Sequence, residues 1–129
     1  MFYILGLSQM SSYHQEKYVS WDEVQFLCRQ LAVRIHRERP DLIRILAITR
    51  GGLFPAGILA RELNIKLIET VGMESYSSSD MSAGQSEVRI LKEFNQRFAH
   101  NVLVVDDLSD TGNTLKELKK SLVKPACIS

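Results

Sequence analysis

Three carboxylates and a short glycine-containing turn stand close together near the end of the chain. Asp106 and Asp107 directly follow an apolar run, and Asp110 comes three residues later. The tetrapeptide Thr111–Thr114 then opens a predicted helix. Main-chain amides at a helix start, together with threonine hydroxyls, can hold a phosphate. Carboxylates beside such an anion site require a neutral or cationic partner, and sugar hydroxyls and Mg²⁺ both qualify. The segment therefore predicts a site for a phosphorylated sugar and a metal ion.

The segment Val104–Thr114 resembles the phosphoribosyl-diphosphate signature of the type I phosphoribosyltransferases. Three further segments resemble the bacterial xanthine-guanine branch of that family, in the same order and at similar spacings: Glu16–Asp22, Ile48–Leu53 and Leu59–Leu63. The resemblance covers residues 16–122. It implies transfer of 5-phosphoribosyl from 5-phospho-α-D-ribose 1-diphosphate to a 6-oxopurine (xanthine, guanine or hypoxanthine), with release of diphosphate.

The resemblance also assigns roles to the carboxylates. Asp106 and Asp107 would hold the ribose hydroxyls, with Asp107 also facing Mg²⁺. Asp110 would be the catalytic residue, because a carboxylate within hydrogen-bond reach can accept or share the N7 proton of the purine. Thr111, Gly112, Asn113 and Thr114 would grip the 5′-phosphate, and Leu108, Ser109 and Asp110 would complete the substrate-binding loop.

A second glycine-bearing loop, Thr49–Gly52, follows an earlier apolar run. In the family the corresponding loop binds diphosphate. Gly51 and Gly52 permit a tight backbone turn there, and Arg50 can neutralise the leaving group.

The polar stretch of residues 75–86 resembles the family's mobile lid, which closes over the reacting centre and excludes water. Ser75 and Tyr76 match the Ser-Tyr pair at its start. Where relatives place an arginine near its far end, this chain has Ser86, with Arg89 and Lys92 nearby. The sequence leaves open which of these cations contacts diphosphate.

Strands and helices alternate along the chain around these loops. Ser20–Glu23 is a capping-box pattern that opens a predicted helix over 21–38, and Pro40 ends it. Further helices are predicted over 53–63 and 115–122, and strands over 43–48, 66–71, 87–91 and 102–105. This order predicts an α/β domain with a mostly parallel central sheet flanked by helices. The resemblance implies that the domain has the type I phosphoribosyltransferase fold. Both glycine-bearing loops then fall at the carboxyl ends of strands, where such sheets bind ligands.

The domain organisation predicted is an N-terminal extension over 1–15 and a phosphoribosyltransferase domain over 16–129, incomplete at its C-terminus with the hood subdomain largely missing. The family's hood contacts the base, and no residue after Thr114 can be assigned to that task. The apolar stretch Met1–Leu7 is too short to span a bilayer, so no integral membrane segment is expected. Cys28 is expected to be buried, and the cysteine usage fits a cytoplasmic protein. The resemblance adds peripheral association with the inner membrane.

A formal net charge of +1 provides no overall field for nucleic acid. The expected partners are the phosphoribosyl diphosphate and a purine, and the resemblance implies a homo-oligomer, dimer or tetramer. Two alternatives stay open: an active purine phosphoribosyltransferase, or a truncated, inactive or regulatory relative that binds the sugar diphosphate without turnover. Response-regulator receivers and nucleotide triphosphatases fit less well, because 22 residues after Asp107 cannot supply a receiver's later strands and Gly-x4-Gly-Lys-Ser/Thr is absent.

Overall fold

The computed structural model describes residues 3–5, 18–76, 87–95, 100–107 and 113–123. These residues form one five-stranded sheet with the order β1-β5-β2-β3-β4. Its strands are β1 (Tyr3–Leu5), β2 (Arg44–Thr49), β3 (Leu67–Tyr76), β4 (Glu87–Lys92) and β5 (Val102–Val105). The first three pairings of that order are parallel, and only β3 and β4 pair antiparallel. The predicted α/β class with a mostly parallel sheet is therefore confirmed.

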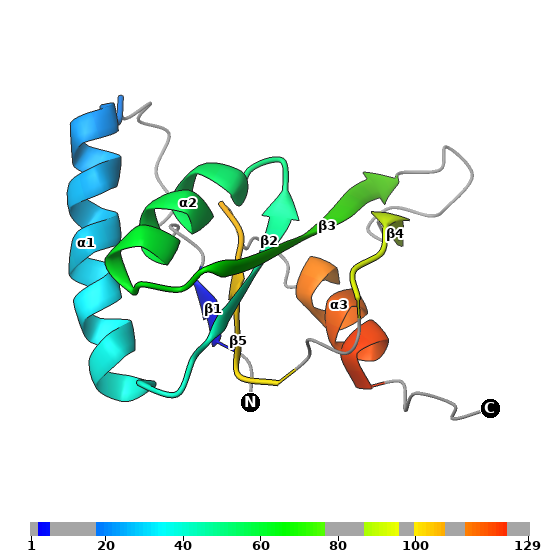
Figure 1. The fold of residues 1–129 in the computed structure, drawn as a ribbon. Coiled ribbons are helices and arrows are strands. Elements are labelled where there is room, and N and C mark those ends of the chain that lie inside the picture. Colours follow the sequence, from blue (N-terminus) through cyan, green and yellow to red (C-terminus); the bar gives the residue numbers. More distant parts are fainter. Residues whose placement is uncertain (1–2, 6–17, 77–86, 96–99, 108–112, 124–129) are drawn as a thin grey trace.

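Helices cover both faces of the sheet (Figure 1). Two helices, α1 (Trp21–Glu38) and α2 (Leu53–Glu62), pack on one face, and α3 (Asn113–Val123) packs on the other. Alternate strand residues point to opposite faces, so each strand supplies both cores. Ile45 and Leu103 join the core beneath α1 and α2, whereas Leu46 and Val104 join the core that contains Leu118 of α3.

The start of α1 follows the predicted capping geometry. The Ser20 hydroxyl oxygen accepts a hydrogen bond from the Glu23 amide at 3.1 Å, which satisfies one of the unpaired amides of the first turn. Cys28 faces inward and is fully buried, and burial raises the pKa of its thiol. Its expected role as a small buried apolar side chain is confirmed. No described helix has the length and apolar character that crossing a membrane requires.

Two features of the sheet differ from the sequence-based expectation. β3 runs on to Tyr76, five residues past its predicted end, because β4 pairs with its far half across a register shift at Gly72/Met73. β2 pairs with β3 only as far as Gly72, and beyond that residue the antiparallel pairing with β4 satisfies the backbone N–H and C=O groups of β3. β1 was not predicted at all, since three residues within a continuous apolar run carry no strand periodicity.

Candidate functional site

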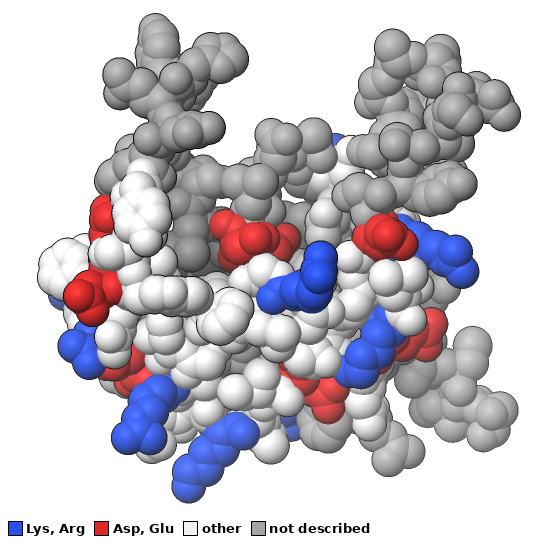
Figure 2. Space-filling view, turned by 90° about the horizontal axis from the view of Figure 1, so that it is seen from above, with Lys and Arg blue, Asp and Glu red and all other residues white. Residues whose placement is uncertain are grey.

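The two glycine-bearing loops leave the same end of the sheet, as predicted. β2 and β5 are parallel neighbours, and Ala47 lies opposite Val105 in their register. The Thr49–Gly52 loop and the pair Asp106-Asp107 therefore emerge side by side. Figure 2 looks down on the molecule from above and shows acidic side chains near the middle of this surface, with basic side chains close to them.

Direct packing joins the two loops at two glycines. A Cβ atom added to Gly51 would collide with the carboxylate group of Asp107. A Cβ atom on Gly52 would collide with the Val105 carbonyl oxygen and lie 2.7 Å from the Ile48 carbonyl oxygen. Gly51 thus leaves room for an acidic side chain of the other loop, and Gly52 lets the loop backbone pack against the ends of both strands.

Backbone hydrogen bonds fix the shape of the Thr49–Gly52 loop. The Gly52 amide donates to the Ile48 carbonyl at 2.8 Å, and the Leu53 amide donates to the Arg50 carbonyl at 3.1 Å. The Thr49 hydroxyl donates to the Val71 carbonyl at 3.2 Å, which ties the end of β2 to β3. The Thr49–Arg50 peptide bond is cis. Sequence reasoning placed Thr49 in this loop but missed its contact with the neighbouring strand.

Arg50 extends its side chain into solvent from this loop. Within the described part of the chain, no hydrogen bond or ion pair involves its guanidinium group. A planar cation in that position can bind a phosphate through two parallel hydrogen bonds without first breaking an internal ion pair.

The acidic pair at the end of β5 is electrostatically strained. The Asp106 carboxylate accepts a hydrogen bond from the Asp107 amide at 2.9 Å and is mostly shielded from solvent, whereas Asp107 is exposed. Burial, the largest cause, together with the neighbouring Asp107 carboxyl group raises the pKa of Asp106 to about 6, although the hydrogen bond from the Asp107 amide lowers it. A cation or sugar hydroxyls beside these two carboxyl groups would favour the charged form of Asp106.

The donor set suits a Mg²⁺ ion that is shared with a ligand. Among the residues the structure describes, no three histidine, cysteine, aspartate or glutamate side chains gather into a metal cage. Mg²⁺ in phosphate sites commonly keeps several waters and takes one or two carboxylates plus phosphate oxygens. Asp106 and Asp107, adjacent at the end of β5, can supply those carboxylates.

Several predicted site residues lie outside the described part of the chain. They are Leu108, Ser109, Asp110, Thr111 and Gly112, so the catalytic and phosphate-gripping roles expected of them stay predictions. Asn113 and Thr114 form the first turn of α3 and are partly exposed, with the helix starting two residues earlier than predicted.

Ser75 and Tyr76 do not begin the polar loop as expected. They are the last residues of β3, where they pair with Val88 and Glu87 of β4. β3 and β4, which form an antiparallel hairpin, are therefore paired up to the edge of the predicted lid. Residues 77–86 of that lid, including Ser86, lie outside the described residues.

The two cations of the hairpin have different surroundings. The Lys92 ammonium group donates to the Thr70 carbonyl at 2.9 Å and to the Thr70 hydroxyl at 2.8 Å. Arg89 lies exposed on β4 opposite Glu74. Lys92 therefore fastens β4 to β3, a role that the sequence did not indicate, and Arg89 is the hairpin cation that stands closer to the end of the strands.

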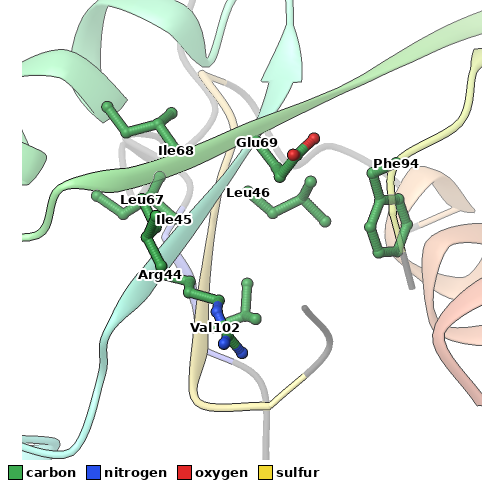
Figure 3. Close-up of a pocket in the computed structure, with 8 residues that line it drawn as sticks. All are labelled: Arg44, Ile45, Leu46, Leu67, Ile68, Glu69, Phe94 and Val102. Carbon is green, nitrogen blue, oxygen red and sulfur yellow. The ribbon is translucent and has the colours of Figure 1, made fainter. Parts of the chain in front are cut away.

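An apolar cavity lies at the opposite end of the sheet. It measures about 50 Å³ and is lined by Arg44, Ile45, Leu46, Leu67, Ile68, Glu69, Phe94 and Val102 (Figure 3). Arg44, Leu67 and Val102 are the first residues of their strands, so the cavity is separated from the acidic pair by the length of the sheet.

Comparison with known proteins identifies the class that this fold and site define. Residues 14–127 match the phosphoribosyl transferase domain family, and the chain belongs to that family. It is 43% identical over 114 residues to a xanthine-guanine phosphoribosyltransferase of Chromohalobacter salexigens, and 38% identical over 114 residues to that of Idiomarina loihiensis. These alignments cover 85% and 86% of this chain but 64% and 67% of the relatives.

The solved structures agree on the fold. A purine phosphoribosyltransferase from Pyrococcus horikoshii superimposes with a TM-score of 0.65 at 24% identity, over 84% of this chain and 68% of that one. The type I phosphoribosyltransferase fold predicted from the signature loop is therefore confirmed. The chain spans about two thirds of the length of the relatives it matches.

Proposed function

We propose that this domain binds 5-phospho-α-D-ribose 1-diphosphate with Mg²⁺ and transfers its phosphoribosyl group to a 6-oxopurine in purine salvage. The contact between Gly51 and Asp107 carries the proposal, because it brings the expected diphosphate loop and the expected ribose carboxylates into one site. The names of the curated relatives, both xanthine-guanine phosphoribosyltransferases, support a xanthine, guanine or hypoxanthine acceptor.

In this proposal the chain acts mainly by positioning and by neutralising charge. Arg50 and the backbone around Gly51 and Gly52 hold the diphosphate. Asp106 and Asp107 accept hydrogen bonds from the ribose hydroxyls and face the metal ion. Bound Mg²⁺ would neutralise charge that builds up on the departing diphosphate. As the bond from the anomeric carbon to diphosphate breaks, N9 of the purine attacks, and Asp110 takes or shares the N7 proton of the base.

Residues 111–114 would hold the 5′-phosphate, and Ser75 and Tyr76 would lie at the base of the closing lid. Arg89 is a better candidate than Lys92 for the cation that contacts diphosphate, because the Lys92 ammonium group already has two acceptors on Thr70. We also propose a cytoplasmic location and a dimeric or tetrameric assembly, in line with the family.

A turnover assay tests this function. The protein is incubated with Mg²⁺ and 5-phosphoribosyl 1-diphosphate plus xanthine, guanine or hypoxanthine in turn, and diphosphate release is followed. Release with at least one base is the expected result, and Asp110→Asn should reduce it strongly. Full turnover in Asp110→Asn would contradict the proton role of Asp110.

A binding domain without turnover is the second candidate function. It is favoured by the make-up of the described site, which brings together the expected diphosphate loop and the expected ribose carboxylates, with no expected base-binding residue among the described ones. Calorimetric titration with Mg²⁺ and phosphoribosyl diphosphate distinguishes the two. Binding without diphosphate release for any base would select the binding domain, and absence of binding would refute both.

A further inference from the structure

The strand that leads into the acidic pair is buried on every side. Val102 to Val105 of β5 have exposed fractions between 0 and 3%. One neighbour of β5 is β2, and the other is the three-residue strand β1 at the outer end of the sheet. β1 is parallel to β5, with Ile4 opposite Val104 and Leu5 opposite Val105.

The peptide groups of β5 require β1. Successive residues of a strand direct their backbone N–H and C=O groups alternately to the two neighbouring strands. β2 can therefore pair with only about half of the peptide groups of β5. Backbone groups that are buried without a partner cost free energy comparable to a lost hydrogen bond each, so removal of β1 would leave such groups unpaired or admit water to them.

The pairing ends where the site begins. Leu5 lies opposite Val105, which directly precedes Asp106, and the Val105 carbonyl oxygen is also the atom against which Gly52 packs. A shift of β5 at this point would move both the acidic pair and its contact with the Thr49–Gly52 loop. β1 itself lies outside residues 14–127, the part of the chain that matches the family.

We propose that residues 3–5 act as a strap: they occupy the outer edge of β5 and, through it, hold Asp106 and Asp107 in position for the sugar ligand. Three residues make few hydrogen bonds, so the strap contributes modestly to overall stability and can be detached without unfolding the domain. The effect on the ligand rests on the proposed function, whereas the effect on β5 does not.

Amide hydrogen exchange on the full chain and on variants tests the strap directly. A chain that starts at Met10 lacks β1, and Ile4→Pro disfavours the strand at its central residue while keeping the length. Ile4→Val keeps both the N–H and a strand-forming side chain, and is the matched control. We expect the amides of Val102–Val105 to exchange about tenfold faster in the first two variants, while the amides of Cys28–Ile35 in α1 keep their protection.

The ligand readout is the dissociation constant for 5-phosphoribosyl 1-diphosphate with Mg²⁺. It should rise about three- to tenfold in the Met10-start and Ile4→Pro chains and stay unchanged in Ile4→Val. Unchanged exchange in β5 in the Met10-start chain would overturn the strap, and so would uniform loss of protection across β5 and α1 in both variants. If the full chain fails to bind the ligand, the proposed function fails, and the exchange of β5 still decides on the strap.

Discussion

The Asp107 carboxylate occupies the space in which Gly51 would carry its side chain. The two residues are 56 positions apart in the sequence, and their contact makes one site of two loops. Gly51 permits this position of the Asp107 side chain, because the carboxylate lies where a Cβ atom would be.

The first prediction concerns this contact. Gly51→Ala should push the Asp107 side chain aside, because the carboxylate can rotate into solvent whereas the loop backbone is held by hydrogen bonds. Affinity for phosphoribosyl diphosphate should fall about tenfold or more, and the free energy of unfolding should change by less than about 1 kcal/mol. Calorimetric titration and urea unfolding measure the two quantities. Wild-type affinity in Gly51→Ala would show that Asp107 does not contact the ligand from its present position.

The second prediction separates Gly52 from Gly51. Gly52→Ala would press a methyl group against the carbonyl oxygens of Val105 and Ile48, which belong to the rigid ends of two strands. We expect a loss of about 2–3 kcal/mol in the free energy of unfolding. Gly57→Ala in α2 is the matched control, because nothing lies within 4 Å of its added Cβ atom. Alanine there should stabilise the helix by about 0.5–1 kcal/mol. Equal stability of the Gly52→Ala and Gly57→Ala proteins in urea would refute this packing.

The sequence predicted that the two loops lie at the same end of the sheet, because each loop and its strand form a local pattern. The acidic pair, the diphosphate loop and their strands each occupy a few consecutive residues, and parallel strands bring their carboxyl ends together. What it could not predict depends on partners distant in the sequence. The continuation of β3 to Tyr76 depends on β4, the position of Lys92 depends on Thr70, and β1 depends on the edge of β5. None of these pairings leaves a periodic pattern in the segment itself.

The third prediction is a pH dependence of stability that arises from Asp106. Its pKa is raised to about 6 in the folded protein, above the ordinary value of about 3.9 for an unfolded chain. The folded state therefore binds more protons than the unfolded state between these two values, and stability falls as the pH rises through that window. Asp106→Asn should flatten this decline and stabilise the protein by about 1–2 kcal/mol near pH 7.5, with little effect near pH 4.

Urea unfolding of both proteins at pH 4, 5, 6 and 7.5 measures the predicted difference. A constant offset between them at all four values would mean that the ionisation of Asp106 does not differ between the folded and unfolded states. The same shift predicts that phosphoribosyl diphosphate and Mg²⁺ bind more tightly as the pH rises through about 6, because the ligand requires the ionised carboxylate.

The fourth prediction distinguishes the two hairpin cations. Lys92→Met removes both hydrogen bonds to Thr70 and should destabilise the protein by about 0.5–1.5 kcal/mol, with faster amide exchange along β4. Arg89→Met should leave stability nearly unchanged, since the side chain is exposed, and should weaken ligand binding. Each variant is the control for the other, because both replace a cation of β4 with methionine. If Lys92→Met weakened binding and left β4 protected, the assignment of the two cations would have to be exchanged.

The fifth prediction concerns Arg50, whose guanidinium group lies in solvent beside the glycines. Arg50→Gln should weaken binding of inorganic diphosphate and of phosphoribosyl diphosphate about 10- to 100-fold, because a charge-assisted pair of hydrogen bonds contributes about 1.5–3 kcal/mol. Stability should not change, because no described side chain depends on Arg50. Arg61→Gln is the matched control: that arginine is also exposed, in the last turn of α2 at the far end from the loop. Titration with ribose 5-phosphate, which lacks the diphosphate, should give the same affinity for Arg50→Gln and wild type. Equal losses for the two ligands would place Arg50 at the sugar phosphate instead of the diphosphate.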